Sequence, residues 1–325
     1  MGMKIAKMFY KKSRLRPLIS RAVIVILIDF LNFSSAFCEG TGARDYYLRG
    51  DWKRAVEGFY AAGLQNLSVE EVKELSMSLY FLGRFEEAGA LIRPFIDKDE
   101  QALVIYYLAI SDKKTKETFK GLSGLESPHA ITARAMILKN REPEEALRLL
   151  NEAIAREQDH FWAWFYRGLI LEEREDFMNA AKAYKNALRL NPFFAQAHNN
   201  LGYCYKESHY YSWAVEEYLK AIELIPDNAG YYYNLGNAYT HLEKIEEAFN
   251  AYKKAVELDP SFAKAHYNLA RTYLRKDMVR EAIEEFRLYL KYGNREVFNF
   301  VAPEDAVREE IEQLEEYLRL YGPAR

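Results

Sequence analysis

Three asparagines recur at a regular interval and offer the clearest chemistry in the chain. Asn200, Asn234 and Asn268 each directly precede a leucine in a segment with helical periodicity. A carboxamide can donate a hydrogen bond to a carbonyl and accept one from an N–H, so a row of them suits binding of an extended peptide backbone. The alternative is that asparagine simply fills this position and helps the helices to pack.

Residue types typical of catalytic and metal sites are scattered along the chain. No two of the six histidines are three or four residues apart, and Cys38 and Cys204 are too distant to build a disulfide framework or a cysteine metal site. His198 and His266 occupy a packing position of the repeat described below, so we expect them to be structural. The sequence contains no HExxH, GxSxG, P-loop or dinucleotide-binding glycine motif. We therefore expect no enzymatic activity, metal site, cofactor or small-molecule substrate.

The asparagines lie within residues 161–292, where one pattern is written four times with a period of 34. In the third copy, Gly236 and Ala248 are small enough to let two helices approach closely. Tyr239 and Tyr252 fill the space around them, and Pro260 ends the second helix. The four columns of the pattern are Gly168, Gly202, Gly236 and Ala270; Ala180, Ala214, Ala248 and Ala282; Tyr184, Tyr218, Tyr252 and Phe286; and Pro192, Pro226 and Pro260.

This period and these residues resemble the tetratricopeptide repeat (TPR), a helix–turn–helix unit that stacks into a superhelix. The resemblance implies an all-α fold: a right-handed α-solenoid of about eight units with a C-terminal capping helix. Neighbouring units bury the surfaces that one unit alone leaves exposed. The resemblance also places the asparagine column in the concave groove, as in TPR superhelices that hold a peptide backbone with an asparagine ladder. The other residues in groove-facing columns are Phe165, Tyr166, Asn199, Tyr203, Tyr233, Asn237, Tyr267 and Arg271.

The tyrosines beside the asparagine column suit peptide capture, because each combines a flat apolar ring with a hydrogen-bonding hydroxyl. The TPR family also has a carboxylate clamp for chaperone C-termini, and Asn237 followed by Asn268 matches that clamp in part. Tyr233 stands where the clamp has a lysine, so we do not expect that ligand.

The first half of the chain matches the pattern less well. Gly50 marks a turn in the first unit, and Pro94 is expected to kink or end a second helix early. Residues 101–126 are expected to form a shortened unit, with a buried helix over 102–110, a short basic helix over 113–122 and a point of flexure after it. At the other end, a helix with one apolar stripe is expected to cap the array; the stripe consists of Ile311, Leu314, Leu318 and Tyr321.

The N-terminus has the order of a secretory signal: seven basic residues, the short apolar segment Ala22–Ile28 and then small residues. We expect cleavage after Ala36. One alternative is an uncleaved membrane anchor, which Asp29 disfavours inside an apolar window that is already short. Another is a lipoprotein modified at Cys38, although Phe37 stands where a small residue is expected. A cytosolic chain is the remaining alternative.

These observations define four parts: residues 1–36 as signal peptide or membrane anchor, 37–126 as degenerate units, 127–300 as regular units and 301–325 as the capping helix. The formal charge is −3, and residues 1–36 carry +6, which leaves −9 on the remainder. An acidic body argues against a nucleic-acid partner, because phosphate binding needs a basic face.

The sequence therefore predicts a non-enzymatic scaffold or adaptor that binds a peptide segment or helix of a partner protein in its concave groove. We expect it to be exported and to be periplasmic or membrane-associated, with membrane attachment through residues 1–36 or Cys38 left open. The alternative is a membrane-anchored or lipidated, chaperone-like assembly factor in cell-envelope or pilus biogenesis.

Overall fold

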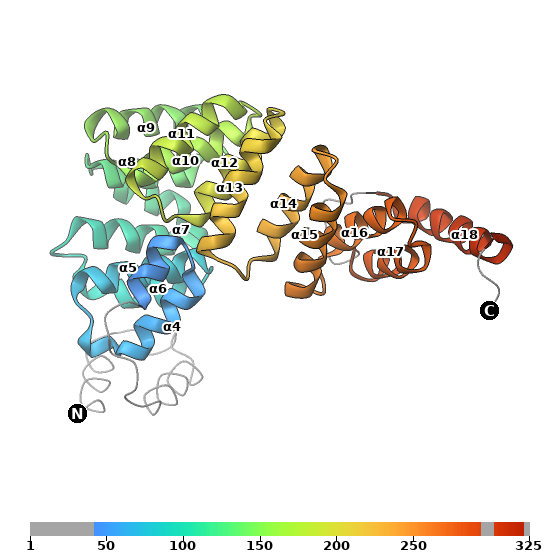
Figure 1. Cartoon of the computed structure of the whole chain (residues 1–325). Helices are drawn as coiled ribbons and strands as arrows, with labels where there is room; N and C mark the ends of the chain where they lie inside the picture. The colour runs from blue at the N-terminus through green and yellow to red at the C-terminus, as the bar shows by residue number, and fades with distance from the viewer. Residues whose placement is uncertain (1–41, 294–301, 322–325) are drawn as a thin grey trace. The chain divides into compact units, whose positions relative to one another are not determined.

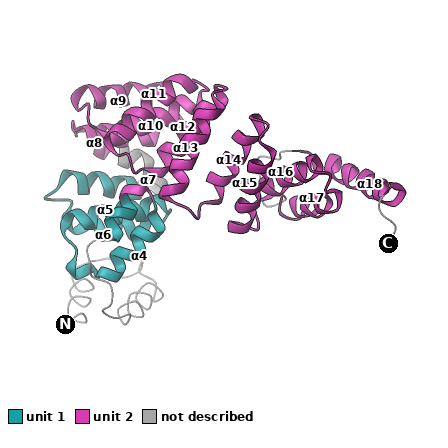
Figure 2. Cartoon of the chain, viewed as in Figure 1, with its two compact units in different colours: residues 1–47, 51–112 teal, residues 48–50, 113–325 magenta. Residues whose placement is uncertain are grey.

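The computed structural model describes residues 42–293 and 302–321, apart from the side chains of residues 110–119. These residues form helices and turns, with no strand among them (Figure 1). The predicted signal segment and Cys38 lie outside the described residues. Figure 2 shows the two compact units of the chain, residues 1–47 with 51–112 and residues 48–50 with 113–325. None of the described helices is long and apolar enough to cross a lipid bilayer.

The division between the two units falls inside a long helix, α7 (Glu100–Ser123). The prediction of two separate helices over 102–110 and 113–122 is wrong, because one helix spans both segments. Only Ser111 and Asp112 separate the apolar segment from the basic one, and neither is a strong helix breaker. The described residues therefore form seven helical hairpins, with α7 in place of a further hairpin.

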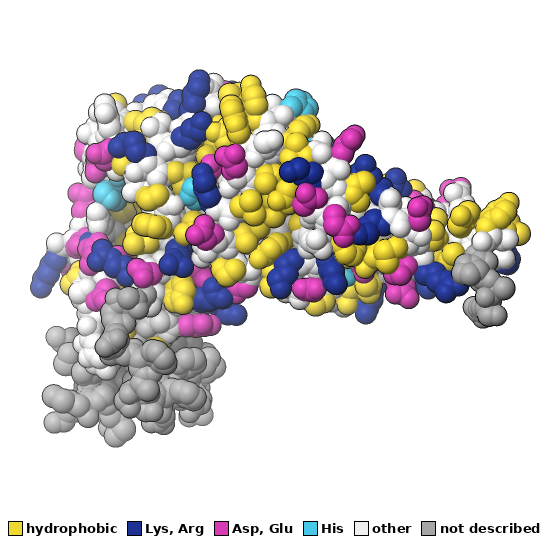
Figure 3. All heavy atoms as spheres, in the orientation of Figure 1, with side chains coloured by type: hydrophobic (Ala, Val, Ile, Leu, Met, Phe, Trp, Pro, Cys, Tyr) yellow, Lys and Arg dark blue, Asp and Glu magenta, His cyan; other side chains and the backbone are white. Residues whose placement is uncertain are grey.

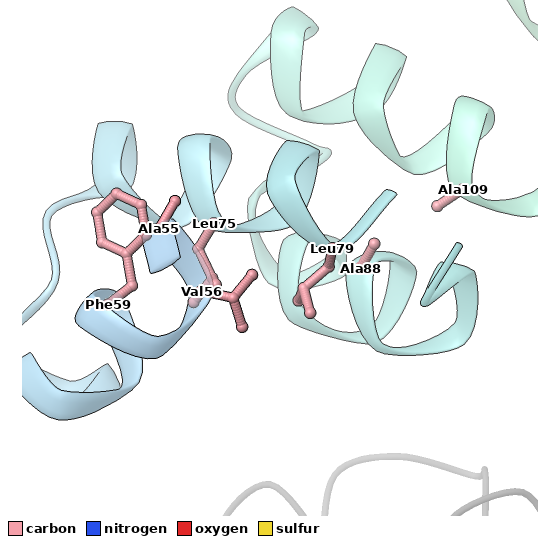
Figure 4. Packing of buried hydrophobic residues seen from close by; sticks show 7 residues of the cluster. All are labelled: Ala55, Val56, Phe59, Leu75, Leu79, Ala88 and Ala109. Atoms are coloured by element: carbon pink, nitrogen blue, oxygen red, sulfur yellow. The ribbon is translucent and has the colours of Figure 1, made fainter. Parts of the chain in front are cut away.

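Unit 1 contains most of α3 (Ala43–Arg49), whose last two residues belong to unit 2, together with α4 (Trp52–Ala62), α5 (Val69–Phe81) and α6 (Phe85–Ile92). Its core joins α4 to α5 and α6 through the side chains shown in Figure 4, including the fully buried Leu75 and Leu79. Gly50, between α3 and α4, has φ +75°, a conformation that glycine adopts without steric cost. The α-helical part of α6 ends before Pro94 and gives way to a short 3₁₀ turn (Arg93–Phe95), which confirms the early end predicted from this proline.

Unit 2 is a series of hairpins in which every helix contacts the next one along the chain. Figure 1 shows the first three of these hairpins side by side. The helices are α8 (Pro128–Leu138), α9 (Pro143–Arg156), α10 (Phe161–Glu173), α11 (Phe177–Leu190), α12 (Ala195–Glu207), α13 (Tyr211–Leu224), α14 (Ala229–His241), α15 (Ile245–Leu258), α16 (Ala263–Arg275), α17 (Val279–Gly293) and α18 (Glu304–Tyr321).

Contact between a small residue and a tyrosine fixes how closely the two helices of each regular hairpin approach. A Cβ atom added to Gly168, Gly202 or Gly236 would lie 2.5, 2.8 or 2.6 Å from the ring of the tyrosine on the second helix of the same hairpin. Such distances are too short for carbon atoms in contact, so only glycine fits opposite a tyrosine here. In the last hairpin, Ala270 and Phe286 replace the pair and are both fully buried. The close approach predicted from these columns is confirmed.

Two histidines are part of the scaffold, as predicted. His198 Nδ1 lies 2.6 Å from Glu217 Oε2 on the second helix of its hairpin, and its Nε2 donates to the carbonyl of Pro192 at 3.0 Å. His266 repeats both contacts two repeats later, at 2.6 and 3.1 Å. Each ring therefore ties the start of a first helix to the second helix of the same hairpin.

Helix α18 continues the series of first helices after an insertion of eight residues in the repeat. Once that insertion is allowed for, Glu310 and Ile311 occupy the positions of Asn268 and Leu269. Ile311 is buried, and Leu314 and Leu318 pack on the same apolar cluster, so the predicted cap is present. Tyr321 was expected on this stripe but is 73% exposed, since it lies in the last turn of α18, beyond the residues that contact the cluster.

An apolar surface remains on the second helices of unit 2. On the face shown in Figure 3, hydrophobic side chains gather over α13 and α14, between interspersed basic and acidic side chains. On α13, Trp213 is 50% exposed and Leu219 is 46% exposed. The described neighbours of α13 therefore leave part of its apolar surface uncovered.

Candidate functional site

All the predicted groove residues lie on the first helices of four consecutive hairpins in unit 2. The structure divides them into asparagines that form hydrogen bonds between hairpins, aromatic residues that belong to the core, and residues that line accessible surface. By helix they are Phe165 and Tyr166 on α10; Asn199, Asn200 and Tyr203 on α12; Tyr233, Asn234 and Asn237 on α14; and Tyr267, Asn268 and Arg271 on α16.

Asn200 is 8% exposed and holds two hairpins together. Its Nδ2 donates to Tyr184 Oη of the preceding hairpin at 3.2 Å, and its Oδ1 accepts from Asn199 Nδ2 at 3.2 Å. Asn234 Nδ2, from the following hairpin, donates to Asn199 Oδ1 at 2.8 Å. Asn200 is thus buried in contacts between hairpins, in agreement with the alternative that asparagine at this position helps the helices to pack. The Asn200 side chain, directly before the buried Leu201, points at the preceding hairpin. There it satisfies the buried hydroxyl of Tyr184, which needs a hydrogen-bond partner.

Asn268 makes a similar contact two interfaces further along. Its Nδ2 donates to Asn237 Oδ1 at 2.8 Å and more weakly to Tyr252 Oη at 3.4 Å, and the same tyrosine hydroxyl donates to Asn237 Oδ1 at 2.8 Å. Asn234 and Asn268 are both half-buried, and their side-chain oxygens accept no hydrogen bond from any described residue. The side-chain NH₂ groups of Asn234 and Asn268 therefore donate hydrogen bonds within the protein, and their side-chain oxygens remain available as acceptors for a ligand.

Phe165 and Tyr166 do not line a groove, contrary to the sequence-based expectation. They are 3% and 7% exposed. The Phe165 ring lies 5.0 Å from the ring of Phe194, which inserts from the turn before α12, and 5.8 Å from Tyr184 on α11. Both residues belong to the core because the turn of the next hairpin covers them.

Tyr233 and Tyr267 are half-buried and pack with one face against second helices or turns. The Tyr233 ring lies 5.0 Å from Phe262, and the Tyr267 ring lies 5.3 Å from Tyr289. Arg271 is exposed, but its guanidinium pairs with Glu310 of α18 at 2.6 Å. The capping helix thus engages Arg271, which is therefore not a free cation in a groove.

A pocket of about 420 Å³ opens beside Tyr203, where the end of α10 and the turn before α11 meet the end of α12. Of the residues around this pocket, only Tyr203 is among the predicted site residues. Four glutamates and a second aromatic ring were missed, because acidic residues at helix ends are usually solvated. The only sequence signal was that Glu173 and Glu207 share one column of the repeat. The pocket is lined by Glu172, Glu173, Glu175, Phe177, Tyr203 and Glu207.

The electrostatics of this acidic pocket favour a cation. Its carboxylates gather at the carboxyl ends of α10 and α12, which carry the negative ends of the helix dipoles. Burial raises the pKa of Glu172 to about 7, against the lowering effect of a 2.7 Å hydrogen bond from Tyr184 Oη. Burial, with Glu207 and Glu172 nearby, raises the pKa of Tyr203 to about 12. Lys206 already places its ammonium 4.8 Å from the Tyr203 ring, a cation–π arrangement.

The acidic pocket and the asparagines form one hydrogen-bonded network. Tyr184 donates to Glu172 and accepts from Asn200, and Asn199 then connects Asn200 to Asn234. The chain of side chains runs from α10 through α11 and α12 to α14. A ligand that binds at the pocket therefore contacts a group whose hydrogen bonds extend over three hairpins.

Comparisons with known proteins agree with this geometry. Family models described as tetratricopeptide repeat match residues 138–177, 171–207 and 263–292, and one described as TPR repeat matches residues 211–242 and 236–277. Residues 138–207 and 211–292 therefore consist of tetratricopeptide repeats. This TPR protein has no match among curated proteins.

Solved structures include similar TPR folds. The APC/C hetero-tetramer Cut9–Hcn1 is 17% identical with a TM-score of 0.60, over 82% of this chain and 53% of that chain, and it shows the shared α-solenoid fold. MamA 41-end from Desulfovibrio magneticus RS-1 is 27% identical with a TM-score of 0.49, over 53% of this chain and 97% of that one. YrrB, a TPR protein with an unusual peptide-binding site, is 19% identical with a TM-score of 0.49, over 59% and 94%.

Proposed function

We propose that this TPR protein is a non-enzymatic scaffold that binds a segment of a partner protein, with a lysine or arginine of that segment seated in the acidic pocket. The observation that carries the proposal is the pocket itself, in which Glu172 and Glu207 approach the rings of Tyr203 and Phe177 between two hairpins. Carboxylates attract the charge of a basic side chain, and an aromatic face adds about 0.5–2 kcal/mol of cation–π attraction. The net negative charge of the chain after residue 36 also attracts a basic segment.

The asparagine network supplies a second set of contacts for the same ligand. The free side-chain oxygens of Asn234 and Asn268 can accept hydrogen bonds from the backbone N–H groups of an extended segment. A cation in the pocket also favours the ionised form of Glu172, whose pKa lies near neutrality. We therefore expect the affinity for a basic peptide to rise between about pH 6 and pH 8, as this carboxyl loses its proton.

Selection of peptides tests the proposal without a known partner. Random dodecapeptides displayed on phage are selected against the purified protein, and one selected peptide is titrated by fluorescence anisotropy. We expect enrichment of lysine or arginine, and at least about tenfold weaker binding to Glu207→Gln and Tyr203→Ala. Glu216→Gln, at an exposed carboxylate on α13, is the control that keeps full affinity. Selected peptides without basic residues, or equal binding to all variants, would overturn the proposal.

Export is the second part of the proposed function, and it rests on residues 1–36 of the sequence. We place the repeats in the periplasm or at the membrane surface, where they would assemble a protein complex. Mass spectrometry of the mature protein tests this placement: a chain that begins at Phe37 indicates a cleaved signal, and a lipidated Cys38 indicates the anchored assembly factor. An intact N-terminus in the soluble cytoplasmic fraction would refute export.

A further inference from the structure

Two histidines from different repeats meet at the interface between two hairpins of unit 2. The rings of His129 and His160 lie 4.4 Å apart with an interplanar angle of 83°. Glu157 joins them, with its Oε2 3.5 Å from His160 Nδ1. One ligand atom from each of the three side chains can be chosen so that all lie within 4.8 Å of one another.

The backbone around this cluster is held in place by its own hydrogen bonds. Glu157 ends α9 and His160 precedes α10, and the His160 N–H donates to the Glu157 carbonyl at 3.2 Å, which closes a tight turn. Trp164 Nε1 donates to the carbonyl of Gln158 inside that turn at 2.8 Å. The backbone positions of these two candidate ligands are thus fixed relative to each other before any ligand binds, which lowers the ordering cost of binding.

The third side chain comes from the start of another first helix. His129 is the second residue of α8, after Pro128 at its first position, and Ser127 caps this helix by accepting from a backbone N–H at 3.2 Å. Helices α8 and α10 are in direct contact. A group that bridges His129 and His160 therefore joins the hairpin α8–α9 to the hairpin α10–α11.

At the next interface along the chain, the positions of the two histidines contain aromatic residues. The residues that correspond to His129 and His160 in the following repeat are Trp162 and Phe194, whose rings meet edge to face at 5.8 Å. Apolar packing is thus sufficient for a stable contact between hairpins at this place. Histidines at both positions, with a carboxylate beside them, satisfy the packing and add three metal-ligand atoms.

We propose that His129, Glu157 and His160 bind one zinc-type divalent transition-metal ion at the interface between these hairpins. Two imidazole nitrogens and one carboxylate oxygen are ligands that Zn²⁺ accepts, and water or a side chain of a bound partner completes a tetrahedral site. Ligand atoms at about 2.0–2.2 Å from Zn²⁺ are roughly 3.4 Å from one another. The separations in the cluster, which lie within 4.8 Å, exceed this value by at most about 1.4 Å, and rotation of the half-exposed Glu157 side chain can bring its carboxylate closer to the histidines.

A neutral imidazole supplies a nitrogen lone pair to a metal, and His129 and His160 can each supply one. The ion would stabilise the folded array, since it binds side chains from two hairpins that unfolding separates.

The test is direct metal binding to the full chain, purified without a histidine tag and freed of metal by chelation. Titration calorimetry with ZnCl₂ should give one tight site, Co²⁺ should give the visible absorption of a tetrahedral site with nitrogen and oxygen ligands, and Mg²⁺ should not compete. His129→Gln and Glu157→Gln should each weaken Zn²⁺ binding by more than about 100-fold. His241→Gln, at an exposed histidine outside the cluster, should leave it unchanged.

His160→Phe separates a lost ligand from a lost fold, because phenylalanine occupies the same position in the next repeat at Phe194. We expect this variant to keep the helical circular dichroism spectrum of the wild type, to lose the tight site and to show no rise in melting temperature on addition of Zn²⁺. No tight Zn²⁺ site in the wild type, or a site that survives all three substitutions, would overturn the proposal.

Discussion

Replacement of a tyrosine by phenylalanine should change the stability of the fold in opposite directions at Tyr218 and Tyr252, because the environments of their hydroxyl groups differ. Tyr252 Oη donates to Asn237 Oδ1 at 2.8 Å and lies 3.0 Å from Thr240 Oγ1. Tyr218 is equally buried, but its hydroxyl has no hydrogen-bond partner among the described residues. Asn234 occupies the position from which Asn200 and Asn268 donate to the tyrosine hydroxyl of the preceding hairpin. Its amide donates to Asn199 of α12 instead. Burial raises the pKa of Tyr218 well above its usual range, so this hydroxyl remains protonated and uncharged.

The magnitude follows from the cost of an unpartnered polar group. A buried hydroxyl without a partner costs about 1–3 kcal/mol, so Tyr218→Phe should stabilise the fold by about 1 kcal/mol or more. Tyr252→Phe removes hydrogen bonds and leaves the Asn237 oxygen with one donor fewer, and should destabilise the fold by about 1 kcal/mol. Phenylalanine fits this column, since Phe286 occupies it in the last hairpin and is fully buried.

Thermal and urea unfolding of the two variants measure the difference. We expect the melting temperature of Tyr218→Phe to rise by about 2–4 °C and that of Tyr252→Phe to fall by a similar amount. Repeat arrays can unfold in stages, so hydrogen exchange of the amides of α12 and α13 provides a local measurement. Equal destabilisation by both substitutions would show that the Tyr218 hydroxyl has a partner and would refute the reasoning.

Three further predictions concern the helix contacts and the acidic pocket. Gly236→Leu should lower stability by at least about 1–3 kcal/mol, because even its Cβ would overlap the tyrosine ring; an unchanged melting temperature would argue against this packing. The pKa of Glu172 is raised in the folded state, so its stabilising contribution is complete below about pH 4.5 and is lost as the pH rises through 7. Glu172→Gln should therefore match the wild type near pH 5 and exceed its melting temperature near pH 8, and a difference that does not change between these two pH values would contradict the raised pKa. Glu285→Gln should cost about 1–2 kcal/mol in urea unfolding because it weakens the charge-assisted contact with buried His266, and equal midpoints would contradict that role.

Much of the architecture follows from local sequence alone. Gly236 is needed because the ring of Tyr252 lies against it, and both residues are visible in the repeat pattern. His198 and His266 could be assigned to the scaffold because they occupy a packing column. These features are predictable since each depends on contacts within one hairpin, whose geometry the repeat period already implies.

Other features depend on how neighbouring hairpins stack, which no local pattern specifies. The burial of Phe165 follows from the ring that the next hairpin inserts against it, and the hydrogen bonds of Asn200 follow from the hydroxyl that the preceding hairpin presents. The length of α7 was missed for another reason, namely that a change from apolar to basic residues does not interrupt a helix without a breaker.

Spacing along one chain segment was therefore enough to specify the repeat, the helical hairpins and the residues that hold each hairpin together. The stacking of hairpins in three dimensions was needed to show that the asparagines link hairpins, that Glu172 and Tyr203 share a pocket, and that His129 meets His160. Contacts between hairpins join residues from about half a repeat to one repeat apart, and the rotation of each helix against its neighbour selects which side chains meet.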